Sequence, residues 1–339
     1  MRKFLSSRQI ARTLSVSAIA LSAVLASGPD AKAEEDVHFL LDWIPSGEMA
    51  AYYAGWQKGF WKDEGINIKI SRGYGSGDTV SKVAAGAADF GIAGISAIYA
   101  ARARAKAPVK TISALYAHSP HSLFVLKSSG INGFKDLAGK KIGITPGNSH
   151  KLHFPEVARR TGLDENAVTW VNSDASAMAA LLIAKHIDAA PFYSIHHYYQ
   201  NKAAKKHGEE IVVLPFVKAG FAIYSASIMT TEKMINERPE TAKKFLKGLQ
   251  RSLKWAKDNK QEACKLHVKK VPEVALDDCM GSLKAMLGFV FSDHTSQTGM
   301  GRFDPERLKF TYGVTAKSQK LDAKADPMNA VDTRFLPKG

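Results

Sequence analysis

The feature that most constrains the fold of this 339-residue chain is a regular alternation of short β-rich runs with helical stretches. A strand is expected at residues 37–43, a helix at 48–64 and the next strand at 66–71. This alternation is typical of α/β proteins with largely parallel sheets. Further strands are expected at 88–93, 109–116, 122–127, 141–145, 168–172, 189–192, 210–216 and 221–229. Further helices are expected at 78–85, from 96, at 134–137, 149–161, 176–185, 231–257, 262–270, 276–291 and 305–317.

After the expected strand at 122–127 the same alternation of strands and helices starts again, so two lobes of one design are expected. Lobe two (121–217) would be inserted into lobe one (34–120 and 218–339). The chain would cross between them near 118–123 and 216–221, and the two crossing strands would form a hinge. Such a layout allows two lobes to close over a ligand.

The first 33 residues have the organisation of a cleavable signal peptide. Basic residues at 2–12 precede an uncharged run at 13–28, and Ala31-Lys32-Ala33 supplies the small residues of a cleavage site. The apolar run is too short for a membrane span, which needs about 20 residues. No cysteine stands at the cleavage point, so no lipid anchor is expected. We therefore expect a protein that is free in the periplasm.

The formal charge of +15 raises the question of an anionic partner. Removing residues 1–33 leaves +11, and most of this excess lies after residue 218. Its basic side chains recur at helical spacing opposite apolar ones, which is typical of a solvated helix face. We therefore expect no nucleic-acid partner. The face consists of Lys243, Lys244, Lys247, Arg251, Lys254 and Lys257.

Two cysteines, Cys264 and Cys279, lie in consecutive expected helices. An oxidising compartment would permit a disulfide between them, but spacing alone does not give the distance, so the bond stays open at this point. Two thiolates are too few for a cysteine-ligated metal or an iron–sulfur centre. No cofactor is expected.

Several segments resemble, in order and spacing, one family of proteins. They are Leu41-Asp42-Trp43 with Pro45, Tyr52-Tyr53-Ala54, Lys58-Gly59-Phe60, the segment 86–92 (G-A-A-D-F-G-I), the segment 134–143 (F-K-D-L-A-G-K-K-I-G) and Arg334-Phe335-Leu336-Pro337. The family is that of the periplasmic solute-binding proteins of ABC importers. The branch is the one shared with thiamine-pyrimidine synthases and with sulfonate, taurine and nitrate binders.

The resemblance implies a type II periplasmic-binding-protein fold, in which two α/β lobes joined by a two-strand hinge enclose a ligand cleft. It also implies a monomer that captures a small-molecule solute and delivers it to a membrane permease with its ATPase. Ligands of such sheets bind beyond the carboxyl ends of strands. The candidate ligand-binding residues at those ends are Trp43, Glu48, Tyr52, Ser76, Ser96, Tyr116, Asn148, Ser149, Asp174 and Tyr193.

Each candidate has a structural alternative. Trp43 can stack on a planar ligand or belong to the core. Glu48 stands roughly where pyrimidine-binding members carry a His, and its carboxylate can accept bonds from an amino-heterocycle or only oppose a helix N-terminus. Ser76 can bind ligand, and Asp78 is expected to cap the following helix. Because that carboxylate would repel pyrophosphate, the glycine-rich loop around Ser76 is not expected to bind a nucleotide.

The histidines are expected at the surface, since their pairs at 118/121, 150/153 and 196/197 lack a carboxylate that would complete a metal site. Acidic residues predominate in the lobe-one cleft loops, so an uncharged or amine-bearing planar solute, similar to a pyrimidine precursor of thiamine, is the leading expectation. A sulfonate, taurine, nitrate or an aromatic carboxylate is the alternative. A pyrimidine synthase is the alternative of another class; because its Cys-rich motif and cleft His are not found, we expect no enzyme.

Overall fold

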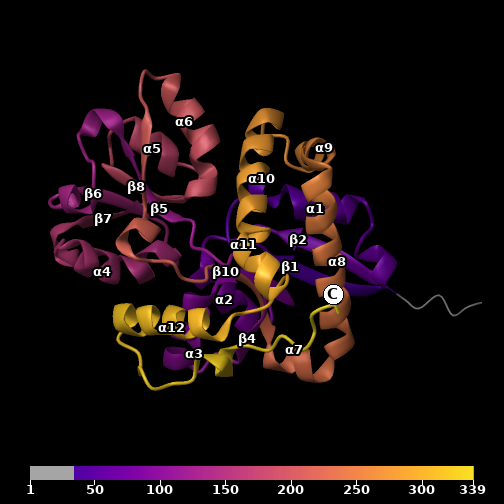
Figure 1. Cartoon of the computed structure of the whole chain (residues 1–339). Coiled ribbons are helices and arrows are strands. Elements are labelled where there is room, and N and C mark those ends of the chain that lie inside the picture. The colour runs from indigo at the N-terminus through magenta and orange to yellow at the C-terminus, as the bar shows by residue number, and fades with distance from the viewer. Residues whose placement is uncertain (1–33, 339) are drawn as a thin grey trace, which may run out of the picture. The chain divides into compact units, whose positions relative to one another are not determined.

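The computed structural model describes residues 34–338, and the predicted signal peptide lies outside them. The early part of the chain and one late strand build the first sheet, in the order β2-β1-β3-β10-β4 (Figure 1). Its strands are β1 (Glu35–Leu40), β2 (Ile66–Ser71), β3 (Phe90–Gly94), β4 (Val109–Ala114) and β10 (Ala226–Thr231). Only β10 runs antiparallel to its neighbours, β3 and β4.

The middle of the chain builds the second sheet, in the order β7-β6-β8-β5-β9. Its strands are β5 (His121–Leu126), β6 (Lys141–Ile144), β7 (Thr169–Asn172), β8 (Ala189–Tyr193) and β9 (Ile211–Pro215). Here β5 is the antiparallel strand. Each sheet is therefore mostly parallel, and the predicted fold class, two α/β lobes of the periplasmic-binding type, is confirmed. The exact lobe boundaries stay a prediction.

The helices cover both sheets, and one group lies where the lobes meet. Lobe one carries α1 (Ala50–Gln57), α2 (Ser76–Ala84), α3 (Ile95–Ala105), α7 (Glu232–Glu237), α8 (Pro239–Asp258), α9 (Lys260–Lys270), α10 (Leu276–Val290), α11 (Asp293–Thr298) and α12 (Pro305–Gln319). Lobe two carries α4 (Ser149–Thr161), α5 (Met178–Ile183) and α6 (His197–Lys205). In Figure 1, α10 stands between α6 of lobe two and the α1, α8 and α9 helices of lobe one.

Several helix bounds differ from the prediction. The helix expected at 48–64 is split into a 3-10 turn, η1 (Gly47–Met49), the shorter α1 and a second turn, η2 (Lys62–Glu64). The helix expected at 231–257 breaks at Pro239, which starts α8 because proline cannot donate the interior hydrogen bond of a continuous helix. Helices α6 and α11 were missed, since their polar sequences show no apolar stripe. Within residues 34–338, no helix is long and apolar enough to cross a bilayer.

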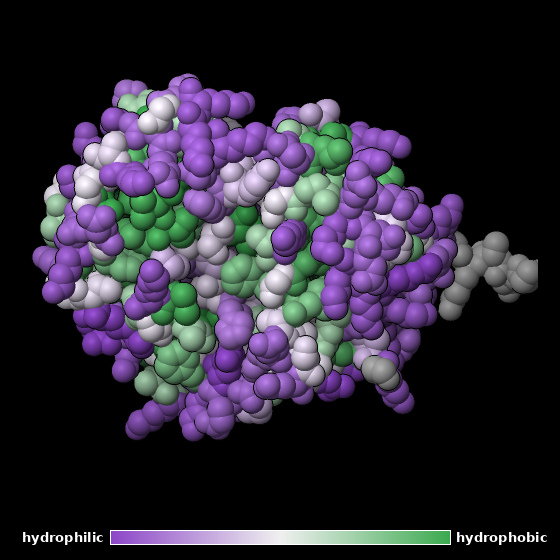
Figure 2. Space-filling view, turned by 45° about the horizontal axis from the view of Figure 1, so that its top comes forward, coloured by the Kyte–Doolittle hydropathy of each residue, from purple (hydrophilic) through white to green (hydrophobic). Residues whose placement is uncertain are grey.

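The basic face predicted after residue 218 is the exposed side of α8 (Figure 1). Several of its cations are paired: Lys247 with Glu64 at 2.8 Å and Arg251 with Asp63 at 2.6 Å. Hydrophilic side chains cover this side of the molecule in Figure 2, as a solvated face requires. The opposite side of α8 is buried.

Phe245 attaches α8 to the first sheet. Its ring stacks on Phe90 with centroids 4.1 Å apart and meets Phe39 at 5.1 Å. Its carbonyl oxygen accepts a hydrogen bond of 3.0 Å from the indole nitrogen of Trp61. The ring is fully buried, so it contributes both apolar burial and aromatic contacts.

We predict that Phe245→Ala lowers the free energy of unfolding by about 3–5 kcal/mol, because it leaves a cavity between α8 and the sheet. Urea denaturation followed by circular dichroism measures the change. Phe310→Ala is the control, since Phe310 is 43% exposed and its loss should change stability by no more than about 0.5 kcal/mol. Equal effects of the two variants would contradict the assignment.

Candidate ligand-binding site

A pocket lies between the two lobes, at the carboxyl ends of their strands. Lobe one contributes the residues that follow β1 and those that start α2. Lobe two contributes the start of α4, the end of β8 and the turn η6 (Ser194–His196). The lining residues are Asp42, Trp43, Gly75, Ser76, Asn148, Ser149, His150, Pro191, Phe192, Tyr193 and His196.

Asp42 places a carboxyl group on the lobe-one wall. The residue is 7% exposed, and burial is the main cause that raises its pKa from 3.8 to about 8, with the nearby Glu48 adding to the effect. The group is therefore mostly protonated at neutral pH. Among the described residues that line the pocket, none is Lys or Arg. The wall consequently offers a neutral carboxyl group, which both donates and accepts a hydrogen bond.

Glu48 lies behind the wall and reaches across to lobe two. Its Oε1 accepts a hydrogen bond of 2.8 Å from Nε2 of His196, and both side chains are at most 3% exposed. The Glu48 Oε2 and the His196 Nδ1 are buried without a hydrogen-bond partner among the described residues. Glu48 thus acts on the pocket through His196, which is itself a lining residue.

Two glycine-containing loops meet on another side of the pocket. The Gly77 amide donates a hydrogen bond of 3.0 Å to the carbonyl oxygen of Gly147. A Cβ on Gly75 would lie 2.9 Å from that same oxygen, and Gly75 has a φ of +128°. Only glycine permits both this backbone conformation and this approach. The sequence G-Y-G-S-G therefore brings the loop of lobe one into contact with lobe two.

Aromatic rings flank the remaining space. Trp43 is 8% exposed, and its Nε1 is buried without a partner among the described residues. On the lobe-two side, the Tyr193 ring lies 6.1 Å from that of His196 at an interplanar angle of 29°. Rings from both lobes can therefore contact the faces of a planar ligand.

A histidine cluster lies behind the lobe-two wall, which corrects the expectation of surface histidines. His121, His150 and His153 are at most 3% exposed, and the His121 ring lies 4.5 Å from that of His150 and 4.8 Å from that of His153. Nε2 of His121 lies 2.8 Å from the Ser149 Oγ. Nδ1 of His150 lies 2.8 Å from the Asn148 Oδ1. His121 of β5 thus meets His150 and His153 of α4 ring to ring.

Burial keeps these rings neutral. It lowers the pKa of His150 from 6.5 to about 3 and that of His153 to about 4, and it holds the pKa of His121 well below its ordinary range. Among residues 34–338, no group of three or more His, Cys, Asp or Glu side chains has the geometry of a metal site.

The structure brings five of the ten candidate residues to the pocket wall: Trp43, Ser76, Asn148, Ser149 and Tyr193. Glu48 and two buried tyrosines lie behind it. Tyr52 and Tyr116 have pKa values raised mainly by burial and then by other groups, with Glu48 and Asp42 among them for both.

Two candidates lie elsewhere. Ser96 is 2.7 Å from the Thr315 Oγ1 and joins α3 to α12. Asp174 is exposed and accepts hydrogen bonds from Ser176. Asp78 does not cap α2, because Gly75 occupies the N-cap position and Asp78 pairs with Lys82 at 2.8 Å.

Asp42, His150 and His196 were missed as candidate site residues. Asp42 belongs to the Leu41-Asp42-Trp43 segment on which the resemblance rests, so its place at the end of a strand was a usable signal. His196 had no such signal, since η6 and α6 were not predicted.

Comparison with known proteins identifies the family. The NMT1/THI5-like family model matches residues 46–263, so the chain belongs to the NMT1/THI5-like family. The predicted relationship to the branch that contains thiamine-pyrimidine synthases and periplasmic solute-binding proteins is thereby confirmed.

Three relatives illustrate the range of the family's neighbours. The chain is 26% identical over 315 residues to the riboflavin-binding protein RibY of Chloroflexus aurantiacus, covering 90% of this chain and 87% of that protein. It is 26% identical over 242 residues to a 4-amino-5-hydroxymethyl-2-methylpyrimidine phosphate synthase of Legionella pneumophila, covering 70% and 74%. The structure of the alkanesulfonate-binding protein SsuA from Xanthomonas axonopodis, bound to MOPS, superposes with a TM-score of 0.69 at 14% identity and covers 88% and 99%.

The synthase relative overturns one expectation. The sequence led us to expect no enzyme, yet relatives that carry the name of a pyrimidine phosphate synthase match 70% or more of this chain in Legionella pneumophila and in yeast. The expectation relied on the lack of the Cys-rich motif and of the family's cleft His, and the named synthase relatives overturn it.

We predict that stability falls as the pH decreases from 7 to 4.5. Between pH 6.5 and about 4 the unfolded chain binds protons that the buried His121, His150 and His153 rings do not, so the free energy of unfolding decreases. Asp42 acts in the opposite direction, because its raised pKa lets the folded state hold a proton below about pH 8. It is one group against at least four, because burial also lowers the pKa of His267 to about 4.

Urea denaturation at several pH values measures this dependence. His153→Gln should reduce the slope by up to about 1.4 kcal/mol per pH unit, which corresponds to one proton. His207→Gln is the control, since His207 is exposed. If both variants kept the slope of the unchanged protein, the buried ring of His153 would not be the cause.

Proposed function

We propose that this protein is the extracytoplasmic solute-binding component of an ABC-type importer, and that its solute is a small planar heterocycle with an amino group beside a ring nitrogen. The observation that carries the proposal is the buried, mostly protonated Asp42 on a pocket wall without Lys or Arg. The solute would be similar to the pyrimidine precursors of thiamine. Closure of the lobes would present it to a membrane permease with its ATPase.

The carboxyl group of Asp42 is complementary to an amino group beside a ring nitrogen, donor to acceptor and acceptor to donor. A neutral carboxyl group has one O–H donor and one C=O acceptor side by side. An aminopyrimidine has a ring nitrogen that accepts and an exocyclic N–H that donates, at the same spacing. Two parallel hydrogen bonds would form, and the unpartnered Trp43 Nε1 would supply a further donor.

The same pocket wall is unfavourable for an anionic solute. A sulfonate or nitrate offers only acceptors, and burying its charge needs a compensating positive group. None of the described lining residues supplies one. The likeness to SsuA supports the shared fold at 14% identity and does not extend to its ligand.

Riboflavin is a second candidate, because the relative RibY matches 90% of this chain. The pyrimidinedione edge of a flavin also carries a donor between acceptors and can pair with a carboxyl group. Its three fused rings and ribityl chain need more room than one ring. The cavity volume of about 30 Å³ is far below the ~300–1,000 Å³ of a typical ligand pocket, so the single ring requires the smaller opening of the lobes.

We predict that 4-amino-5-hydroxymethyl-2-methylpyrimidine raises the melting temperature of the purified protein by several degrees at 100 times its Kd, a stabilisation of about 2.7 kcal/mol. Thermal-shift assays compare it with riboflavin, MOPS and nitrate, and calorimetry gives each Kd. Stabilisation by MOPS or nitrate, with no response to the aminopyrimidine, would reject the proposed solute. Stabilisation by riboflavin alone would identify the flavin, and not the aminopyrimidine, as the solute.

We further predict that Asp42→Asn keeps the aminopyrimidine Kd within about threefold at pH 7, because an amide has the same donor and acceptor pair. In the unchanged protein the affinity should fall about tenfold per pH unit above pH 8, as Asp42 loses its proton, and the Asn variant should lose this dependence. Asp42→Leu removes both hydrogen bonds and should weaken binding about 30-fold.

Asp174→Asn is the matched control, since Asp174 is exposed and outside the pocket lining. It should leave both the Kd and its pH dependence unchanged. If Asp42→Asn bound as weakly as Asp42→Leu, recognition would depend on a negative charge and the neutral pairing would be wrong.

A further inference from the structure

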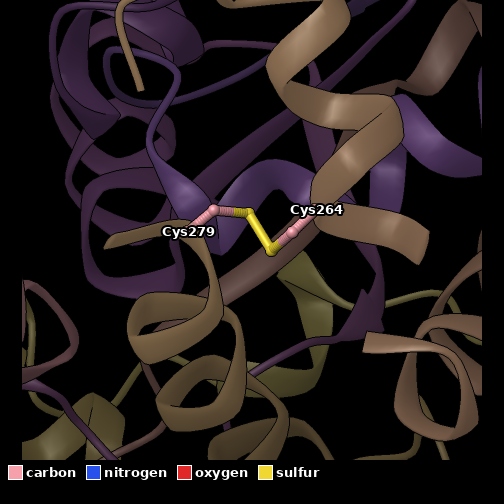
Figure 3. The surroundings of a disulfide bond; sticks show 2 residues. All are labelled: Cys264 and Cys279. Carbon is pink, nitrogen blue, oxygen red and sulfur yellow. A yellow bond between two sulfur atoms is a disulfide. The ribbon is translucent and has the colours of Figure 1, made fainter. Parts of the chain in front are cut away.

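A disulfide joins Cys264 of α9 to Cys279 of α10, close to the turn that carries Glu48. Figure 3 shows this bond. The two Cα atoms are 5.7 Å apart, and both side chains are fully buried. In α9 the neighbouring contacts face α1: the Tyr53 ring lies 4.9 Å from that of His267, and the Gln57 side chain donates to the Leu266 carbonyl oxygen. Helix α9 is thus anchored on lobe one, and the disulfide transmits this anchorage to the first turn of α10.

The first turn of α10 directly contacts η1, the 3-10 turn that contains Glu48. A Cβ on Gly47 would lie 2.4 Å from the Cα and 2.6 Å from the carbonyl oxygen of Cys279, so backbone meets backbone with no room for a side chain. Glu48 is the next residue along the chain. The position of Cys279 therefore sets where η1 can lie and from where the Glu48 carboxylate reaches His196.

The start of α10 also contacts α6 of lobe two, the helix that follows His196. Asp277 and Asp278 each lie 2.6 Å from the Lys202 Nζ in α6. A Cβ on Gly281 would lie 2.5 Å from the Tyr198 ring, which places α6 directly against α10. His196 immediately precedes α6. One short segment of α10 therefore supports both partners of the Glu48–His196 contact.

We propose that the Cys264–Cys279 disulfide is a positioning element of the pocket: it fixes the first turn of α10, which holds Glu48 from lobe one and the helix that follows His196 from lobe two. The proposal rests on the proposed function for its effect on solute affinity. Its effect on the two segments is independent of any ligand. Removing the bond would free the start of α10 and loosen the contact that closes this side of the pocket.

The test combines the double variant Cys264→Ala/Cys279→Ala with hydrogen exchange and binding. Amide exchange followed by mass spectrometry should accelerate at least tenfold in peptides covering residues 44–51 and 193–199, at a temperature well below unfolding. The Kd of 4-amino-5-hydroxymethyl-2-methylpyrimidine should rise at least fivefold.

Leu137→Ala serves as the control for general destabilisation, since Leu137 is fully buried in lobe two and does not line the pocket. At a comparable loss of melting temperature it should leave both segments and the Kd unchanged. If the disulfide-free variant exchanged residues 44–51 no faster than Leu137→Ala, the positioning role would be refuted. The exchange result decides this even if the aminopyrimidine does not bind, an outcome that would count only against the proposed solute.

Gly47→Ala provides a second variant that retains the disulfide. Its Cβ would displace the turn from Cys279. It should reproduce the faster exchange at 44–51 and the higher Kd. A Gly47→Ala protein with the exchange of the unchanged protein would overturn the proposal, also in the case that the double alanine variant does not fold.

Discussion

Two acidic side chains, Asp42 and Glu48, are buried beside each other where the lobes meet. The surrounding structure depends on how each carboxyl group is stabilised away from water. An isolated buried carboxylate is strongly unfavourable, so each needs a proton or a partner. Asp42 keeps its proton, as its raised pKa shows. Glu48 takes a hydrogen bond from His196 of the other lobe. The hydrogen bond that stabilises Glu48 therefore also joins the two lobes.

The scaffold around this pair is made of close backbone contacts. Gly47 lies against Cys279 within lobe one, and Gly75 and Gly77 of lobe one lie against Gly147 of lobe two. A side chain would not fit at Gly47, Gly75 or Gly77. Packing of this kind has few alternative arrangements. The disulfide adds a covalent connection at the first of these contacts. A pocket with such support can hold polar groups in fixed directions, which a binding site for a small heterocycle requires.

Much of the fold followed from the sequence because it depends on local patterns. Strands such as 66–71 and 141–145 were expected within one residue of their bounds, since runs of β-branched residues are recognisable without tertiary information. The loops at the carboxyl ends of strands also placed Trp43, Ser76, Asn148, Ser149 and Tyr193 at one edge. Ser96 and Asp174 lie outside the pocket lining, since a sequence position does not say whether a side chain already has another partner.

The sequence by itself determined the alternation of elements, the division into two lobes and the family, because these depend on periodicity and on short motifs. Only the tertiary structure decided which polar groups are buried together. His150 lies in α4 and His196 in η6, which are far apart in the chain. No local pattern distinguishes a buried histidine from a surface one. The pKa of Asp42 likewise follows from the space around it, since burial is a property of the assembled lobes.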